Sequence, residues 1–323
     1  MRGFYIWSAP RACSKKQGAR ITGERRTARL ESLLVVAGVL FVSLGCATDA
    51  YAADAVATKA AKFRLGNYEV IALYDTTDQL PNDGKVFGLD VGPAEVSRVL
   101  GNAGAASQSI ALSVDALLVR GAGRLMLFDT GVGQAGRGGL LASLAETHTS
   151  PGEITDIFIT HSHGDHTGGL ANAESKLAFP NAVIHMSTKE WDWLRMQPAN
   201  QSLIDTIASQ VRTFEPGIQL VPGVKAIALH GHTPGHVGYE ISSRAERLID
   251  IGDLAHSAIV SLARPSWKLG FDVDRVQAAK TRQTMLARLA TTGERVFAPH
   301  FPFPGVGRIS RNGEGYVWIP AAQ

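Results

Sequence analysis

Residues 159 to 166 place three histidines and an aspartate within six positions, directly after an apolar run. The four side chains are His161, His163, Asp165 and His166. A buried histidine or aspartate costs free energy unless it is paired or bound to an ion. Four such groups at one strand end therefore predict a metal site, the alternative being a solvated polar loop.

The spacing of these residues favours two ions over one. Residues 155 to 160 are short, apolar and β-rich, so they predict a buried strand. His161 and His163 leave its end two positions apart, and extended backbone places both side chains on one side. Gly164 permits a sharp turn, after which residues 165 and 166 can reach a second position nearby.

The first 52 residues differ in composition from the rest. They carry eight Lys/Arg against three Asp/Glu, followed by an uncharged stretch over 33–45 and a small-x-small cleavage signal at Ala50-Tyr51-Ala52. This pattern predicts an export signal over residues 1–52 and a mature domain over 53–323, placed in the periplasm or secreted. Twin-arginine export through Arg25-Arg26 and lipoprotein processing at Cys46 are the alternative routes.

The uncharged stretch is shorter than the roughly 20 residues of a membrane span, so no stable insertion is expected after cleavage. The chain has 32 basic and 29 acidic residues, and subtracting those of the leader leaves 24 basic and 26 acidic residues in the mature chain. This near-neutral balance does not predict a nucleic-acid-binding surface. Cys13 and Cys46 both lie in the leader. A metal site in the mature chain must therefore use nitrogen and oxygen ligands.

The mature chain predicts one α+β domain. Strands are expected over 63–75, 112–129, 155–160, 182–186, 224–229, 237–241, 247–251 and 295–298. Helices are expected over 140–148, over 191–195 with Ser187 as N-cap and Glu190 three positions on, and over 273–290. Because many strands are joined by short turns, two mixed sheets with helices outside them are favoured over a simple parallel sheet.

Three further strand ends carry metal-ligand residues: His232, Asp253 and His300. In order and type, the whole set resembles the metallo-β-lactamase superfamily. The resemblance implies a four-layered αβ/βα sandwich with two metals between its sheets. It implies that the first metal is held by His161, His163 and His232, the second by Asp165, His166 and His300, and that Asp253 bridges them. Asp129 matches the superfamily's early aspartate, which would orient the ligands.

Other segments, namely 177–182, 221–225 followed by 230–236, and 303–307, are similar to bacterial methyl parathion hydrolases. The metal ligands themselves are shared with N-acyl-homoserine lactonases, so the pocket must decide among substrates. An apolar pocket for an aryl or acyl group is expected from a set of mostly aromatic residues: Trp191, Trp193, Leu194, Trp267, Phe271, Phe301 and Phe303.

The resemblance implies hydrolysis of a small-molecule ester, lactone or phosphotriester. Two divalent ions, with Zn²⁺ expected first, would present a bridging hydroxide near neutral pH. Asp253 would hold the pair together and Asp165 would orient the nucleophile, which makes these two the candidate catalytic residues. Alternatives are a mononuclear iron sulfur dioxygenase, a β-lactam hydrolase and a non-enzymatic binding protein. A homodimer is expected only by analogy.

Five histidines lie outside the ligand pattern. His148 and His185 are expected to be structural or exposed. His230, His236 and His256 lie close to predicted ligands in the sequence. Contact with a ligand or a substrate is weighed for them against ordinary hydrogen-bonded packing.

Overall fold

The computed structural model describes residues 59–322, so the predicted leader and its cleavage site lie outside the described residues. Within 59–322, no helix combines the length and the apolar character needed to cross a membrane.

Within residues 59–322, fourteen strands form two sheets of seven. The first sheet follows chain order: β1 (Ala60–Leu65), β2 (Tyr68–Pro81), β3 (Ser109–Gly121), β4 (Arg124–Phe128), β5 (Asp156–Phe158), β6 (Val183–Ser187) and β7 (Val211–Phe214). The second runs in reverse chain order: β14 (Gly315–Pro320), β13 (Val306–Asn312), β12 (Arg295–Phe297), β11 (Glu246–Asp250), β10 (Val237–Ser243), β9 (Val224–Ala228) and β8 (Gln219–Val221). Both are mixed: β4 to β7 are parallel neighbours, and so are β11 and β12.

The α-helices are α1 (Pro93–Asn102), α2 (Leu140–Glu146), α3 (Gly164–Thr167), α4 (Thr188–Arg195), α5 (Gln201–Ile207), α6 (Val260–Ala263) and α7 (Arg275–Thr292). Short 3₁₀ turns are η1 (Gln134–Gly136), η2 (Pro151–Glu153), η3 (Gly168–Leu170), η4 (Pro198–Asn200) and η5 (Gly252–Leu254).

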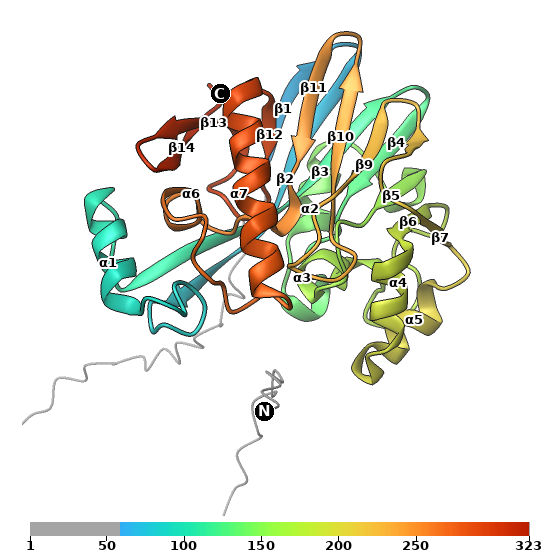
Figure 1. Cartoon of the computed structure of the whole chain (residues 1–323). Coiled ribbons are helices and arrows are strands. Elements are labelled where there is room, and N and C mark those ends of the chain that lie inside the picture. Colours follow the sequence, from blue (N-terminus) through green and yellow to red (C-terminus); the bar gives the residue numbers. More distant parts are fainter. Residues whose placement is uncertain (1–58, 323) are drawn as a thin grey trace, which may run out of the picture. The chain divides into compact units, whose positions relative to one another are not determined.

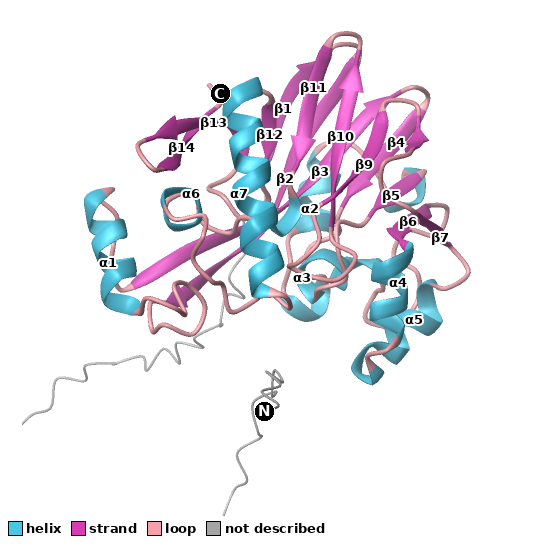
Figure 2. Ribbon diagram, in the orientation of Figure 1, coloured by secondary structure: helices cyan, strands magenta, loops and turns pink. Residues whose placement is uncertain are grey.

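The sheets and the helices outside them form layers (Figures 1 and 2). Within residues 59–322, three apolar cores hold these layers together. Inward residues of both sheets, among them Phe128, Phe158 and Tyr239, form the core between the sheets. A second core packs α2, α4 and α5 on the outer face of the first sheet, and a third packs α7 on the outer face of the second. This arrangement is the predicted αβ/βα sandwich.

Local signals account for where the main helices start and stop. Ser187 accepts a hydrogen bond from the backbone N–H of Glu190, as expected of an N-cap. Asp274 caps α7 by accepting from Val276 and Gln277, and Gly293 ends that helix with φ 62°. The predicted helix over 273–290 is therefore shifted by two residues.

The sequence-based pattern missed several elements, namely α1, α5, β7, β8, β13 and β14. In the described structure β2 and β3 extend well beyond their neighbours, and α1 and α6 pack near the far end of this pair (Figure 1). Val96, Val99 and Leu100 of α1 contribute to that separate small core.

Candidate metal centre

The predicted ligands and the predicted orienting residue Asp129 all follow the carboxyl ends of strands. Asp129 follows β4, residues 161 to 166 follow β5 and continue into α3, and His232 lies between β9 and β10. Asp253 follows β11 and His300 follows β12. Because β4 and β5 are parallel, as are β11 and β12, their carboxyl ends meet at one edge of each sheet.

The first group contains three histidine nitrogens at nearly equal distances. His161 Nε2 lies 3.0 Å from His163 Nδ1 and 3.1 Å from His232 Nε2, and the last two atoms are 3.0 Å apart. Zinc–nitrogen bonds of about 2.0–2.1 Å at tetrahedral angles require about 3.3 Å between ligand nitrogens. The three nitrogens therefore need to move apart only slightly to bind one small cation. Asp253 Oδ2 completes the group at 3.2 Å from His232 Nε2.

The second group shares Asp253 through its other oxygen. Asp253 Oδ1 lies 3.1 Å from His166 Nε2 and 3.0 Å from His300 Nε2. Asp165 Oδ2 lies 3.5 and 3.6 Å from the same two nitrogens. Among the described residues, Asp253 Oδ1 and the Nε2 atoms of His166 and His300 are buried and lack a hydrogen-bond partner. Convergent buried acceptors without donors fit a cation.

Outer hydrogen bonds orient the histidines so that Nε2 faces the centre. Asp129 accepts from His166 Nδ1 at 2.8 Å and also from the backbone N–H and hydroxyl of Thr160. His300 Nδ1 donates to the Ser113 carbonyl at 2.7 Å. Each bond puts the ring proton on Nδ1 and leaves the Nε2 lone pair for a metal. The predicted orienting role of Asp129 agrees with this geometry.

His232 is oriented by a residue that sequence reasoning missed. Its Nδ1 lies 3.1 Å from Asp272 Oδ1, and Asp272 Oδ2 accepts from Arg282 at 2.9 Å. The Asp272 and Arg282 side chains are each 1% exposed. The only sequence signal is an arginine on the buried face of α7, among Ala278, Met285 and Leu286.

Burial and charge set the protonation of the cluster. Burial lowers the pKa of His161 and brings that of His163 to about 3, so both imidazoles are neutral, as metal ligation requires. Burial also lowers the pKa of His232, but Asp253 and Asp272 outweigh it and raise that pKa to about 9. Protons therefore compete with a metal for His232.

The structure separates the remaining histidines. His236 accepts the backbone N–H of Asp253 on Nε2 at 3.1 Å and so supports the shared carboxylate. His256 is buried, with Nε2 3.0 Å from Asp253 Oδ2. His185 pairs with Asp156 and stacks on Phe158, a structural role, and His148 is exposed.

The predicted apolar pocket was partly wrong. Leu194 and Phe301 are fully buried in the outer cores, and Trp191 packs against the same core as Leu194. Trp193 and Phe271 do reach the cluster, with ring centroids 6.0 Å from His163 and 5.3 Å from His256 respectively. Sequence alone could not tell these cases apart, because all are large apolar residues and the sequence does not show which way each side chain points.

Trp267 and Phe303 pack elsewhere. Trp267 lies against the small core that contains α1, and Phe303 meets Tyr74 edge to face beside the core between the sheets. No ring contact with a histidine of the cluster is found for either within residues 59–322.

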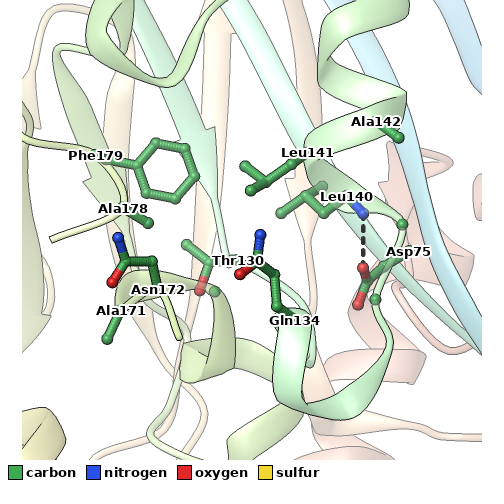
Figure 3. Close-up of a pocket in the computed structure, with 14 residues that line it drawn as sticks. Asp75, Thr130, Gln134, Leu140, Leu141, Ala142, Ala171, Asn172, Ala178 and Phe179 are labelled. Atoms are coloured by element: carbon green, nitrogen blue, oxygen red, sulfur yellow. Dashed lines mark hydrogen bonds between the residues drawn. The ribbon is translucent and has the colours of Figure 1, made fainter. Parts of the chain in front are cut away.

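The glycine-rich loop over 131–139 packs against Gly168 and Gly169, which follow α3. Asp75 accepts from the backbone N–H of Val132 at 2.7 Å. It also accepts from the backbone N–H of Leu140 at 2.8 Å (Figure 3). A Cβ on Gly133 would lie 2.1 Å from the carbonyl oxygen of Gly168, so only glycine allows this approach. A mainly apolar cavity of about 220 Å³ lies beside the loop and is lined by none of the predicted ligands.

Comparison with known proteins agrees with this fold and site. The family model described as the metallo-beta-lactamase superfamily matches residues 110–300. A curated hydroxyacylglutathione hydrolase from Rhodopseudomonas palustris (strain HaA2) is 30% identical over 107 residues, covering 31% of this chain and 36% of that protein. The chain thus matches only about a third of that relative.

Solved structures match over much more of the chain. AidC, a dizinc quorum-quenching lactonase solved with its product, is 31% identical and covers 82% of this chain and 98% of its own, with a TM-score of 0.78. AbOPH, a hydrolase in the beta-lactamase superfamily, is 28% identical, and the match covers 83% of this chain and 99% of AbOPH, with a TM-score of 0.75. A probable metal-dependent hydrolase from Staphylococcus aureus, 20% identical with a TM-score of 0.67, shares the fold. The chain belongs to the metallo-beta-lactamase superfamily and is a metal-dependent hydrolase of that superfamily.

Proposed function

We propose that this chain is a dinuclear, zinc-dependent lactonase that opens acylated homoserine lactones. The observation that carries the proposal is the pair of ligand groups that share Asp253: His161, His163 and His232 on one oxygen, and Asp165, His166 and His300 near the other. The lactonase that is 31% identical over nearly its whole length, and is dizinc, supports this choice of reaction and metal.

Two divalent ions held by these residues would lower the pKa of water and polarise the substrate carbonyl. The side chains of the protein would orient the reacting groups and exclude bulk water from the site. Asp253 is a buried carboxylate: burial raises its pKa, but the surrounding histidines, His300 first, hold it well below the usual value. Asp165, whose side chain is 32% exposed, has an oxygen beside the second group and is suited to orient the attacking water.

An apolar rim beside the cluster favours an acyl substrate. Phe271 and Val273 are 36% and 54% exposed. Val273 is tied to the cluster because its backbone N–H donates to the carbonyl of His232 at 2.9 Å. The Trp193 ring lies beside His163, with ring centroids 6.0 Å apart. Exposed apolar side chains beside a polar centre are typical of a ligand site and suit an acyl chain on a polar lactone ring.

His256 is the proposed donor to the substrate oxygen. Burial lowers its pKa, so the ring is neutral and carries one N–H. It stacks on His300 with centroids 5.2 Å apart and an interplanar angle of 7°, and Phe271 covers it. Within the described structure neither ring nitrogen has a hydrogen-bonding partner besides the contact with Asp253. His256→Phe should raise KM or lower kcat while two ions remain bound.

The test uses the mature chain from residue 53, with its metal content measured beside initial rates on three substrates. These are a long-chain acyl-homoserine lactone, an aryl phosphotriester and a cephalosporin. About two zinc ions per chain and preferred lactone turnover are expected. The phosphotriester is the second candidate, favoured by the methyl-parathion-hydrolase-like segments such as 303–307. One iron per chain without hydrolysis would refute the proposal in favour of an oxygenase.

The leader supports a proposed site of action outside the cytoplasm. Its basic start, uncharged stretch and Ala50-Tyr51-Ala52 signal favour cleavage and release to the periplasm or the medium. N-terminal sequencing of protein recovered from the periplasm should begin near residue 53. A homodimer is proposed by analogy, and sedimentation of the mature chain tests it.

A further inference from the structure

Glu190 is a buried carboxylate whose side chain leaves its own helix. It sits three residues after the N-cap Ser187 and is 0% exposed. In a capping box its carboxylate would turn back to the backbone N–H of Ser187. The structure shows only the other half of that motif, in which Ser187 Oγ accepts from the Glu190 N–H at 3.3 Å.

The carboxylate instead accepts four hydrogen bonds from two separate segments. Oε1 accepts from the backbone N–H of Ser162 at 2.8 Å and from its hydroxyl at 2.7 Å. Oε2 accepts from the hydroxyl of Thr233 at 2.6 Å and from the backbone N–H of Gly235 at 3.0 Å. All four of these donors are neutral groups. Four neutral donors therefore replace the water that burial removes.

These two segments carry the three nitrogens of the first ligand group. Ser162 lies between His161 and His163, and Thr233 directly follows His232. The contact is also close along the backbone, since a Cβ added to Gly235 would lie 2.2 Å from the Glu190 nitrogen. Each oxygen of one rigid carboxylate thus holds one of the two segments, and the carboxylate fixes their separation.

We propose that Glu190 is a positioning residue that sets the spacing of His161 and His163 relative to His232, and thereby the affinity of the first group for zinc. The inference rests on the metal centre of the proposed function. Glu190 touches neither ion nor substrate in this role, because its four bonds are all to Ser162, Thr233 and Gly235.

The fold does not depend on this contact alone. The two sheets are joined independently where the backbone N–H of Val237 donates to the Thr160 carbonyl at 3.0 Å and Tyr239 donates to the Ile159 carbonyl at 2.7 Å. Loss of the Glu190 bonds should therefore loosen the ligand segments while the sandwich stays intact.

Glu190→Gln is the sharpest test, because glutamine has the same shape but presents an N–H₂ group where one oxygen stood. In either orientation of the amide, its N–H₂ group faces the hydrogen-bond donors of one of the two ligand segments, where an acceptor is needed. We expect zinc affinity to fall about 10- to 100-fold, the usual effect of losing an outer partner of a metal ligand. The affinity is measured on metal-free protein by competition for Zn²⁺ with a chromophoric chelator, beside its thermal unfolding.

Asp156→Asn is the matched control. Asp156 is also a buried carboxylate, 1% exposed, and accepts from Arg124, Thr155 and His185, away from the cluster. It should lower the Tm of the metal-free protein and leave zinc affinity at the wild-type value. If Glu190→Gln lowered Tm as the control does but bound zinc as tightly as wild type, its role would be structural and the proposal refuted.

Two milder variants keep the test decisive if Glu190→Gln does not fold. Ser162→Ala and Thr233→Val each remove one hydroxyl donor to Glu190. Each should weaken zinc binding, and the double variant should weaken it further. Unchanged affinity in all three refutes the inference. A wild-type chain that binds no zinc would instead refute the proposed function itself.

Discussion

Replacing Asp272 by alanine should damage stability and metal binding by two separable routes. Asp272 holds His232 through one oxygen, at 3.1 Å, and Arg282 through the other, at 2.9 Å. The Asp272 and Arg282 side chains are each 1% exposed. Removing the carboxylate leaves a buried guanidinium without its counter-charge and a metal-ligand histidine without its acceptor.

The expected size of each effect follows from this burial. Breaking a buried ion pair by removing one partner costs about 3–5 kcal/mol of unfolding free energy. For a chain of this size that corresponds to a fall in Tm of roughly 6–20 °C. Losing the outer partner of a ligand weakens metal affinity about 10- to 100-fold.

The double variant Asp272→Ala/Arg282→Met separates the two routes. An apolar residue in place of Arg282 removes the unpaired charge, so most of the lost Tm should return. His232 Nδ1 still lacks its acceptor, so zinc affinity should stay low. Thermal unfolding in the presence of a chelator gives the Tm, and competition for Zn²⁺ on the same samples gives the zinc affinity. Recovery of affinity together with Tm would show that Asp272 merely neutralises Arg282, and the orienting argument would fail.

Other expectations address the ligands and the acidic groups around them. His163→Ala and Asp253→Ala should each abolish lactone turnover and lose bound metal in elemental analysis, whereas His148→Asn, on an exposed residue with φ 56°, should match wild type in both. Full rate with two ions in Asp253→Ala would overturn the shared-carboxylate assignment. Removing metal with a chelator should lower Tm, because ions that bind only the folded state stabilise it, and an unchanged Tm would contradict a site at this position. Burial, with help from Asp129, raises the pKa of Asp250 to about 8 from an ordinary value of 3.8. The folded state therefore keeps a proton that the unfolded state loses, so metal-free stability should fall as pH rises from 3.8 to about 8. In denaturant titrations, Asp250→Asn should make the free energy of unfolding depend less on pH. An unchanged pH dependence would contradict the raised pKa of Asp250.

The two outer residues of the first ligand group show where sequence reasoning stopped. Glu190 fitted a capping box, which is a local pattern, yet its carboxylate joins segments 28 and 43 residues away. Asp272 lies 40 residues from His232 and precedes a helix, where acidic residues are common. Neither partner is visible along the chain, because hydrogen bonds between distant segments leave no periodic signal in the sequence.

The pocket residues failed for a related reason. Leu194 and Trp193 are neighbours on α4, but helical geometry turns the first into the core and the second toward His163. Phe271 and Phe301 are both aromatic and both lie outside helices and strands, but the former stays 36% exposed and the latter is fully buried. Which side of a helix or loop faces the core is decided only when the layers pack.

By itself, the sequence determined the ligand types and their order, because closely spaced histidines and aspartates after apolar strands have few uses other than metal binding. It also determined that strands and helices build two mixed sheets with helices outside, because alternation, turns and caps act locally. The family resemblance implied that Asp253 is shared by both groups, and the structure places it there. Tertiary structure alone decided that Asp272 and Glu190 hold the first group, that Trp193 lies beside His163 and that Phe271 lies beside His256. These outcomes depend on how the sheet built from residues 60–214 and the sheet built from residues 219–320 meet at their strand ends, and the packing of the whole domain sets that arrangement.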